Sequence, residues 1–307
     1  MSLETVDQFI TTIHIDGMHG RMLRMPAQSP TARRDIMLLY GQHASLERMT
    51  GLAEVLTEYG RVTVPDLPGF GGMDSFYDVH KTPSLDNFAD YLAEYITQNY
   101  DDDTQITLIA MSFSFLIATR MLQRHPELVP RVHMLVSFVG FVHHSDFHVP
   151  KPLYWLWYVV ASLCENRVGA ALWTKILLRP FVIRTVFMLV AKLHPKMKDA
   201  NAQERKRRIA FEAKLWQIND LPTRMHTLKI MLTADLSHHK VAMPVYHVAV
   251  AHDFYFDNKL VEQHMRDVYS DFTLITANVE AHAPTIISTA AEAAPFVPDA
   301  LRALMRS

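Results

Sequence analysis

A serine, an aspartate and a histidine occur in the order and the local settings that nucleophilic catalysis requires. Ser112 comes just after the β-prone, mostly apolar run 106–110, where a helix start rich in apolar and small residues begins. Asp253 and His282 each come just after a later β-prone run. A serine hydroxyl attacks a carbonyl when a histidine takes its proton and a carboxylate orients that histidine. The pattern therefore favours a catalytic triad of Ser112, Asp253 and His282.

Each member of this set has an alternative interpretation. Ser112 is also in a position to cap the helix that follows it, a common role for serine. Ser114 is a second candidate nucleophile, although its backbone would already belong to that helix. Asp257 competes with Asp253 for the acid role, but it lies farther beyond its strand.

The elements that must position these residues follow an alternating pattern. Strand-like and helix-like segments alternate from residue 35 to residue 141, which is typical of βαβ units and a parallel sheet. Loops at the carboxyl ends of such strands meet at one edge of the sheet. The predicted strands are 35–40, 61–64, 106–110, 132–138, 244–250 and 272–276, preceded by a hairpin of 8–15 and 21–25 that turns at Gly17–Gly20. Ser45 and Ser84 are expected to cap helices, and a final helix is expected at 299–305.

The alternation stops in the middle of the chain. Between residues 143 and 239 only helical patterns occur, at 153–164, 169–178, 181–193, 202–215 and 222–232. We therefore predict an α/β protein with a mostly parallel sheet flanked by helices and an all-helical insertion. Its core would be 1–142 and 240–307, and its helical cap 143–239.

Four short motifs in chain order resemble those of the α/β-hydrolase fold family, of the type with a helical cap. They are Tyr40–Gly41–Gln42–His43, Asp66–Leu67–Pro68–Gly69–Phe70–Gly71, Ala110–Met111–Ser112–Phe113–Ser114 and His282–Ala283–Pro284. The resemblance covers the predicted core and the insertion together. It implies that Ser112 is the nucleophile, His282 the base and Asp253 the acid. It also implies that the backbone N–H groups of Gln42 and Phe113 form the oxyanion hole.

The sequence departs from the family pattern at three positions. Ala110 and Ser114 replace the two glycines that usually flank the serine turn, and Tyr40 replaces the usual histidine before Gly41. Glycine there relieves crowding between strand and helix. Alanine adds one methyl group, and the hydroxyl of Ser114 can bond a nearby backbone carbonyl. We therefore expect tolerable strain and a working site.

The insertion carries what substrate information there is. It is rich in large apolar side chains, most of which are expected to pack the cap helices together. In the resembling family the cap lies over the nucleophile, so some of them would face the substrate. We predict substrate contacts from His43, Trp155, Trp173 and Trp216. An apolar cap surface suits an acyl chain or aromatic ester better than a sugar or a charged metabolite.

These features predict a serine hydrolase that cleaves carboxylic esters with an apolar acyl or alcohol part, without a cofactor. The same triad also supports carbon–carbon bond hydrolysis or acyl transfer. A third alternative is a binding protein that keeps the fold without turnover, because both flanking glycines are missing.

Composition excludes several other classes of protein. The 307 residues are 49% hydrophobic and carry a formal net charge of −2, which argues against nucleic acid as the main partner. Cys164 is the only cysteine, so no intrachain disulfide forms and a reducing compartment is expected. The first residues lack the features of a secretory signal, and no apolar stretch reaches the length of a membrane span. We expect a soluble, cytoplasmic protein.

Two further patterns have residue types that occur in binding sites. The basic run 204–208 lies beside apolar helices, which leaves peripheral membrane contact as a minority alternative to a solvated helix face. The pairs His143–His144 and His238–His239 flank the insertion. Adjacent histidines on an extended backbone point to opposite faces, so neither pair is expected to bind a metal.

Overall fold

The structure is a computed structural model that describes residues 6–165, 169, 202–251, 253–279 and 289–306. Its centre is an eight-stranded sheet with the order β1-β2-β4-β3-β5-β6-β7-β8. The strands from β4 to β8 in this order are parallel, whereas β2 is antiparallel to both β1 and β4. The strands are β1 (Ile10–Ile15), β2 (Met18–Met25), β3 (Arg34–Leu39), β4 (Gly60–Pro65), β5 (Ile106–Met111), β6 (Val132–Phe138), β7 (Val241–Val250) and β8 (Tyr269–Ala277).

All the predicted strands are present, and one turn differs from the prediction. The hairpin turns at Asp16–Gly17 rather than over Gly17–Gly20, because both residues have positive φ (52° and 81°) and make a two-residue connection. Gly20 instead lies inside β2. A Cβ atom there would come within 1.9 Å of the sulfur of Met73, so this glycine serves packing and not the turn.

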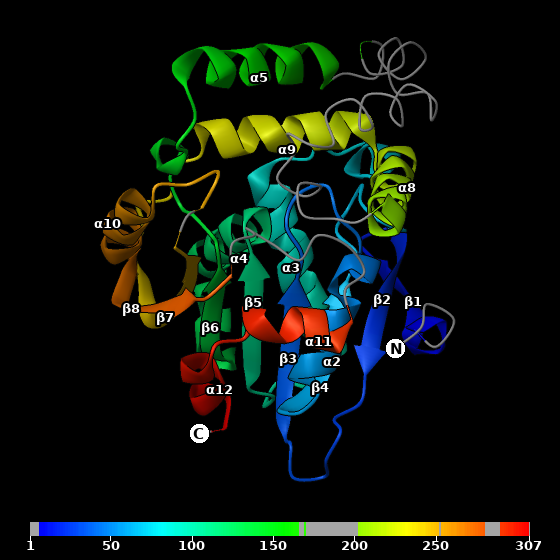
Figure 1. Cartoon of the computed structure of the whole chain (residues 1–307), viewed down its shortest axis with the longest axis vertical. Helices are drawn as coiled ribbons and strands as arrows, with labels where there is room; N and C mark the ends of the chain where they lie inside the picture. The colour runs from blue at the N-terminus through cyan, green and yellow to red at the C-terminus, as the bar shows by residue number, and fades with distance from the viewer. Residues whose placement is uncertain (1–5, 166–168, 170–201, 252, 280–288, 307) are drawn as a thin grey trace.

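Helices cover both faces of the sheet. In Figure 1, α2 (Thr50–Leu56) and α11 (Ala290–Ala293) lie in front of the strands, and α3 (Leu85–Asn99) and α4 (Phe113–Arg124) lie behind them. An edge-to-face contact of 5.7 Å between the rings of Phe88 and Phe113 joins α3 to α4. Outside α5, α8 and α9, the remaining described helices are η1 (Asp7–Phe9), η2 (Leu46–Met49), η3 (Phe76–Val79), η4 (Pro126–Arg131), η5 (His144–Asp146), α10 (Asn258–Val268), η6 (Ala294–Phe296) and α12 (Asp299–Arg306).

Of the two serines predicted to cap helices, one does so through its side chain and the other does not. Ser84 caps α3, with its hydroxyl oxygen 3.1 Å from the amide nitrogen of Asn87, as predicted. The prediction for Ser45 is wrong, because its side chain makes no capping bond. The amide of Leu46 donates instead to the buried carboxylate of Asp66 at 2.9 Å. A distant residue therefore replaces the local cap.

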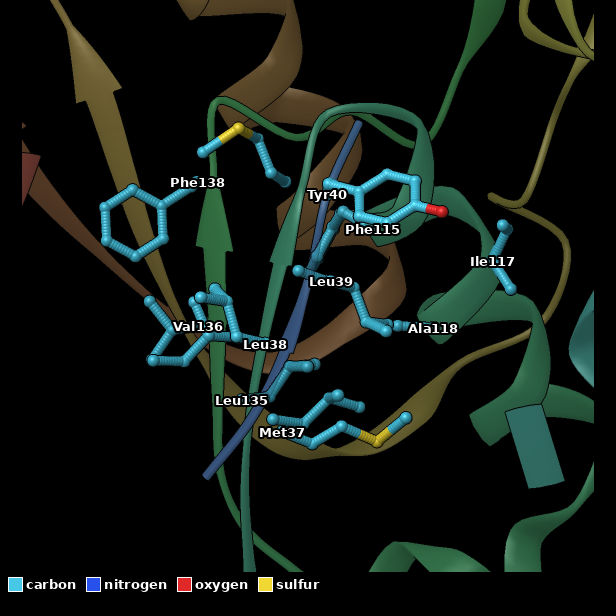
Figure 2. Packing of buried hydrophobic residues seen from close by; sticks show 14 of the residues in the cluster. Met37, Leu38, Leu39, Tyr40, Phe115, Ile117, Ala118, Leu135, Val136 and Phe138 are labelled. Atoms are coloured by element: carbon cyan, nitrogen blue, oxygen red, sulfur yellow. The ribbon is translucent and has the colours of Figure 1, made fainter. Parts of the chain in front are cut away.

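The core is centred on the middle strands. All six residues of β5 are buried, the pattern of a strand covered on both faces in a parallel sheet. Figure 2 shows side chains of β3, β6 and α4 packing together around it, among them Leu38, Val136 and Phe115, each fully buried. Tight packing of this kind holds the end of β5, where Ser112 follows, in one position.

Three helices are described in the insertion. They are α5 (Lys151–Cys164), α8 (Ala202–Ile218) and α9 (Leu221–Thr233), which confirm the helices predicted at 153–164, 202–215 and 222–232. The segments predicted at 169–178 and 181–193 lie, apart from residue 169, outside the described residues, and the boundaries 143–239 stay a prediction. In Figure 1, α9 crosses beyond the carboxyl ends of the central strands, and α5 lies on its outer side. No helix in the described ranges has the length and apolarity to cross a membrane.

Candidate active site

Ser112 occupies a strained turn between β5 and α4. Its backbone angles are φ 50° and ψ −117°, a region that favours glycine. Its amide donates to the carbonyl of Phe138 at 2.9 Å, and its carbonyl accepts the amide of Phe115 at 3.0 Å. Such strain costs about 1–3 kcal/mol and persists where the surrounding structure imposes it. The side chain of Ser112 makes no helix-capping bond, so the interpretation of this serine as a side-chain cap is wrong.

Ser114 reinforces this turn from below. Its hydroxyl is fully buried, accepts the amide of Met111 at 2.9 Å, and lies within bonding distance of the carbonyls of Leu39 (3.2 Å) and Met111 (2.9 Å). This confirms the expectation that the hydroxyl bonds a backbone carbonyl. A fully buried hydroxyl with these partners is out of reach of a substrate, which leaves Ser112, at 8% exposed, as the more accessible serine of the turn.

Gly41 brings a second loop against the serine. A Cβ atom on Gly41 would lie 3.3 Å from the Cβ and 3.9 Å from the Oγ of Ser112. The next residue is Gln42, and Phe113 is the first residue of α4, where helical amides have no partner within the helix. Within the described part of the chain, no acceptor faces the backbone N–H of Gln42 or of Phe113. Both amides are thus available to an oxyanion formed next to Ser112.

The loop after β3 is also tied to the insertion. The side-chain amide of Gln42 donates to the carbonyl of Arg224 at 3.0 Å and to the hydroxyl of Thr227 at 2.9 Å, both on α9. The neighbouring His43 has a positive φ of 55°, and its ring lies 4.7 Å from that of Trp216 on α8. The predicted oxyanion loop is therefore fixed from the sheet side and from the cap side.

Asp66 organises the loop that follows β4. Its buried carboxylate accepts the Nε of Arg21 at 2.7 Å, the amide of Gly72 at 2.8 Å and the hydroxyl of Tyr40 at 3.0 Å, besides the amide of Leu46. Burial is the largest influence on this carboxyl and raises its pKa, against the nearby Arg21 charge. The departure at Tyr40 is thereby explained, because its hydroxyl bonds Asp66 and also accepts the amide of Leu67 at 2.7 Å.

The predicted acid loop follows β7. Asp253 accepts the amides of Tyr255 and Phe256 on Oδ1, at 2.7 and 3.1 Å, which fixes the carboxylate against its own loop. The buried ring of Phe256 stacks on Phe141 at 4.7 Å and holds the loop against the segment after β6. The rival Asp257 caps α10 by accepting the amides at the helix start. This capping role accounts for the position of the Asp257 side chain.

Comparison with known proteins finds similarity in solved structures. No protein-family model matches the sequence, and no curated protein matches it. Three of the matching structures, each of low sequence identity, are as follows. An esterase from Exiguobacterium antarcticum has a TM-score of 0.67 at 15% identity, over 97% of this chain and 99% of that one. A membrane phospholipase A described as a bacterial virulence factor has a TM-score of 0.64 at 14% identity, over 97% of this chain and 86% of that one. An enol-lactonase from Burkholderia xenovorans has a TM-score of 0.59 at 10% identity, over 96% and 97%.

The chain has the α/β-hydrolase fold. Ser112 lies at the turn from β5 to α4, Gly41 lies in the loop after β3, and Asp253 lies in the loop after β7.

Two of the predicted site residues fall outside the described residues. They are His282, predicted as the base, and Trp173, predicted to contact substrate. The pairing of His282 with Ser112 and with Asp253 therefore stays a prediction.

The remaining predicted substrate residues lie in different surroundings. Trp216 lies beside His43, next to the loop that faces Ser112. Trp155 lies on α5 with 59% of its surface exposed, and its ring contacts are to Tyr154 and Tyr158 of the same helix. In Figure 1, α9 lies between α5 and the sheet. Of these residues, Trp216 and His43 are thus the ones beside the serine loop.

A buried histidine lies one strand away from the serine turn. His247 on β7 is 2% exposed, and its Nδ1 lies 2.9 Å from the hydroxyl of Ser137 on β6. Burial lowers the pKa of His247 to about 4, and the nearby Asp253 opposes this only in part. The ring is therefore neutral at physiological pH, and it is a structural group of the sheet.

One of the two histidine pairs, His143–His144, differs from the geometry expected of it. The rings of His143 and His144 lie 4.2 Å apart, so the expectation that they point to opposite faces is wrong for this pair. The extended backbone ends at His143, because η5 begins at the next residue. His143 also stacks on His264 at 4.4 Å, and the Nδ1 of His264 lies 2.5 Å from Asp146. In the ranges that the structure describes, no group of three or more His, Cys, Asp and Glu residues is placed to hold a metal.

Two residues beside the site were not singled out from the sequence. Asn219 accepts the amide of Gly71 at 2.9 Å, and its side-chain nitrogen lies 3.3 Å from the Nδ1 of His43. Arg224 lies with its guanidinium carbon 3.5 Å from the ring centroid of Trp216. A helix-start signal is visible at 219–222, where Asp220 caps α9. That signal places the turn but says nothing of its long-range contacts.

Proposed function

We propose that the protein is a serine hydrolase that cleaves carboxylic esters with an apolar acyl or alcohol part. The observation that carries the proposal is the positive φ of 50° at Ser112, held between β5 and α4 with Gly41 against its side chain. A strained backbone at Ser112, next to two amides that have no acceptor among the described residues, fits a nucleophile, and the Ser112 side chain makes no helix-capping bond.

The proposed reaction passes through an acyl-enzyme. His282 takes the proton of Ser112, whose Oγ attacks the ester carbonyl carbon. The backbone N–H groups of Gln42 and Phe113 hold the tetrahedral oxyanion, and Asp253 stabilises the protonated histidine. The carbon–oxygen bond to the alcohol then breaks, and the alcohol leaves with the proton from His282. Water attacks the acyl-enzyme by the same route and releases the acid.

Hydrolases among the matching structures support this proposal, as does the environment of the site. An esterase and a lactonase are among the proteins that share the fold. Trp216, beside the loop that faces Ser112, and the apolar residues on neighbouring helices of the cap suit the hydrocarbon part of an ester.

A panel of p-nitrophenyl esters from acetate to palmitate tests the proposal. We expect release of p-nitrophenol by the wild-type protein with a preferred chain length, loss of at least about a thousandfold in kcat for Ser112→Ala, and no change for the exposed Ser145→Ala. Equal activity of the wild-type protein and Ser112→Ala would exclude Ser112 as nucleophile. Absence of turnover in a folded wild-type protein across the panel would favour a binding protein.

A further inference from the structure

Arg224 is a half-buried cation with two buried hydrogen-bond donors that are unused in the described part of the chain. It belongs to the first turn of α9, and its Nε and Nη1 are buried without a hydrogen-bond partner in the part of the chain that the structure describes. Its guanidinium lies on the ring of Trp216, at 3.5 Å from carbon to centroid. Stacking on an aromatic face fixes the plane of the guanidinium but satisfies none of its N–H groups.

The charges around Arg224 do not balance among the described residues. The described carboxylate that acts on it is that of Glu212, which is 3% exposed and already pairs with Arg48 at 2.7 Å. Arg48 is itself buried, so within the described ranges two guanidinium groups share the Glu212 carboxylate. Burial lowers the pKa of Arg224. A buried positive charge without its own counter-ion is costly, and an anion placed beside it removes that cost.

Arg224 also lies next to the predicted reaction centre. Its backbone carbonyl accepts the side-chain amide of Gln42 at 3.0 Å, and the ring of Trp216 contacts both its guanidinium and the ring of His43. Gly41, the residue before Gln42, is the one that faces Ser112. An anion bound to Arg224 would therefore sit beside the loop that receives the ester carbonyl.

We propose that Arg224 binds a carboxylate of the substrate, so that the preferred substrates are monoesters of dicarboxylic acids. The inference rests on the proposed ester hydrolysis. The planar guanidinium matches a carboxylate with two parallel hydrogen bonds, and one unit of excess charge matches one carboxylate. Trp216 would contact the hydrocarbon between the two carboxyl groups. The reaction consumes one water, breaks the ester bond at Ser112 and yields a dicarboxylate, the alcohol and one proton.

Paired substrates that differ in one carboxylate test this inference. The monomethyl esters of succinate, glutarate and adipate are each compared with the methyl ester of the monocarboxylic acid of the same carbon number. We expect the wild-type protein to prefer the anionic member of at least one pair by about 10- to 100-fold in kcat/KM, the range that one charge-assisted contact supplies. Arg224→Met, which keeps a long apolar stem on Trp216, should remove that preference, and Arg224→Lys should keep part of it.

A matched control comes from another arginine. Arg266 lies over the ring of Phe272 at 4.8 Å, but it is exposed and pairs with Glu262. Arg266→Met should leave the ratio of kcat/KM for the anionic ester to kcat/KM for the neutral ester unchanged. A wild-type protein without preference for any anionic ester, or an Arg224→Met variant that lowers both activities by the same factor, would overturn the inference.

A binding measurement separates this inference from the proposed function. Succinate, glutarate and adipate are added to Ser112→Ala, and the shift in melting temperature is compared with that of Ser112→Ala/Arg224→Met. We expect at least one dicarboxylate to stabilise the first protein and not the second. Binding without turnover of any ester by the wild-type protein would refute the hydrolase and keep the carboxylate site. Turnover without such binding or preference would refute the carboxylate site and keep the hydrolase.

Discussion

The strain at Ser112 predicts an unusual order of stabilities among substitutions at this position. The backbone angles of φ 50° and ψ −117° are costly for any residue with a Cβ atom and easy for glycine. Ser112→Gly should therefore release about 1–3 kcal/mol of strain, while glycine loses about 0.5–1 kcal/mol more backbone entropy on folding than alanine. The net expectation is that Ser112→Gly is about 0–2.5 kcal/mol more stable than Ser112→Ala, with a midpoint of about 1 kcal/mol.

The comparison of two variants isolates the backbone. Both substitutions remove the hydroxyl, so that the loss of any bond made by Oγ cancels in the difference. Urea unfolding followed by tryptophan fluorescence gives the free energy of unfolding of each variant, provided that the transition is reversible. Both variants should lack esterase activity, which links the cost in stability to the function that it serves.

Ser137 supplies a matched control, at which the glycine variant should be less stable than the alanine variant. It is fully buried in β6, where the backbone is extended. There Ser137→Gly should be about 0.5–1 kcal/mol less stable than Ser137→Ala. If Ser112→Gly is no more stable than Ser112→Ala while the Ser137 pair behaves as expected, the turn at Ser112 is not strained and the argument for an imposed nucleophile conformation fails.

Three further predictions concern buried groups near the site. His247 has a pKa of about 4 in the folded protein, below the ordinary 6.5 of histidine, so the unfolded chain binds its proton first as the pH falls. The free energy of unfolding should therefore fall by about 2 kcal/mol between pH 7.5 and pH 5. Urea unfolding of His247→Gln at the two pH values should show a fall smaller by that amount, and the same fall as in the wild-type protein would contradict the prediction. Asp66→Asn should lower the free energy of unfolding by about 3 kcal/mol, because Arg21 and several donors lose a fully buried carboxylate. Asp16→Asn, at an exposed ion pair, should lower it by less than about 1 kcal/mol. Similar losses at both positions would refute the role of Asp66. Ser114→Ala should lower the free energy of unfolding by about 1–2 kcal/mol through loss of its buried hydrogen bonds, and a neutral result would mean that the hydroxyl does not support the turn.

The sheet could be predicted from the sequence because its signals are local. Strands such as 132–138 are short apolar runs bounded by breakers, and the structure reproduces this one at Val132–Phe138. The hairpin turn was misplaced because Gly20 has the residue type of a turn but serves packing against Met73. Ser45 likewise has the residue type of a cap, but a carboxylate distant in sequence takes the amide instead.

The site was predictable where motifs carry it and not where long-range contacts do. Ser112 stands in a strand–turn–helix pattern, and its neighbour Ser114 makes the expected backbone bond. The partners of Gln42 on α9 and the stacking of Arg224 on Trp216 arise from elements that come together only in the folded chain. No local periodicity encodes them. The exposure of Trp155 has the same cause, because residue type alone does not say which face of α5 meets another helix.

Covalent labelling with a fluorophosphonate probe shows whether Ser112 is a nucleophile. Such a probe phosphonylates a serine only where the hydroxyl is activated and the oxyanion is held. We predict stoichiometric modification of Ser112, located by mass spectrometry of the digested protein, and no modification of Ser112→Ala or of the heat-denatured chain. A folded wild-type protein that remains unlabelled, or that carries the label on another serine, would contradict it.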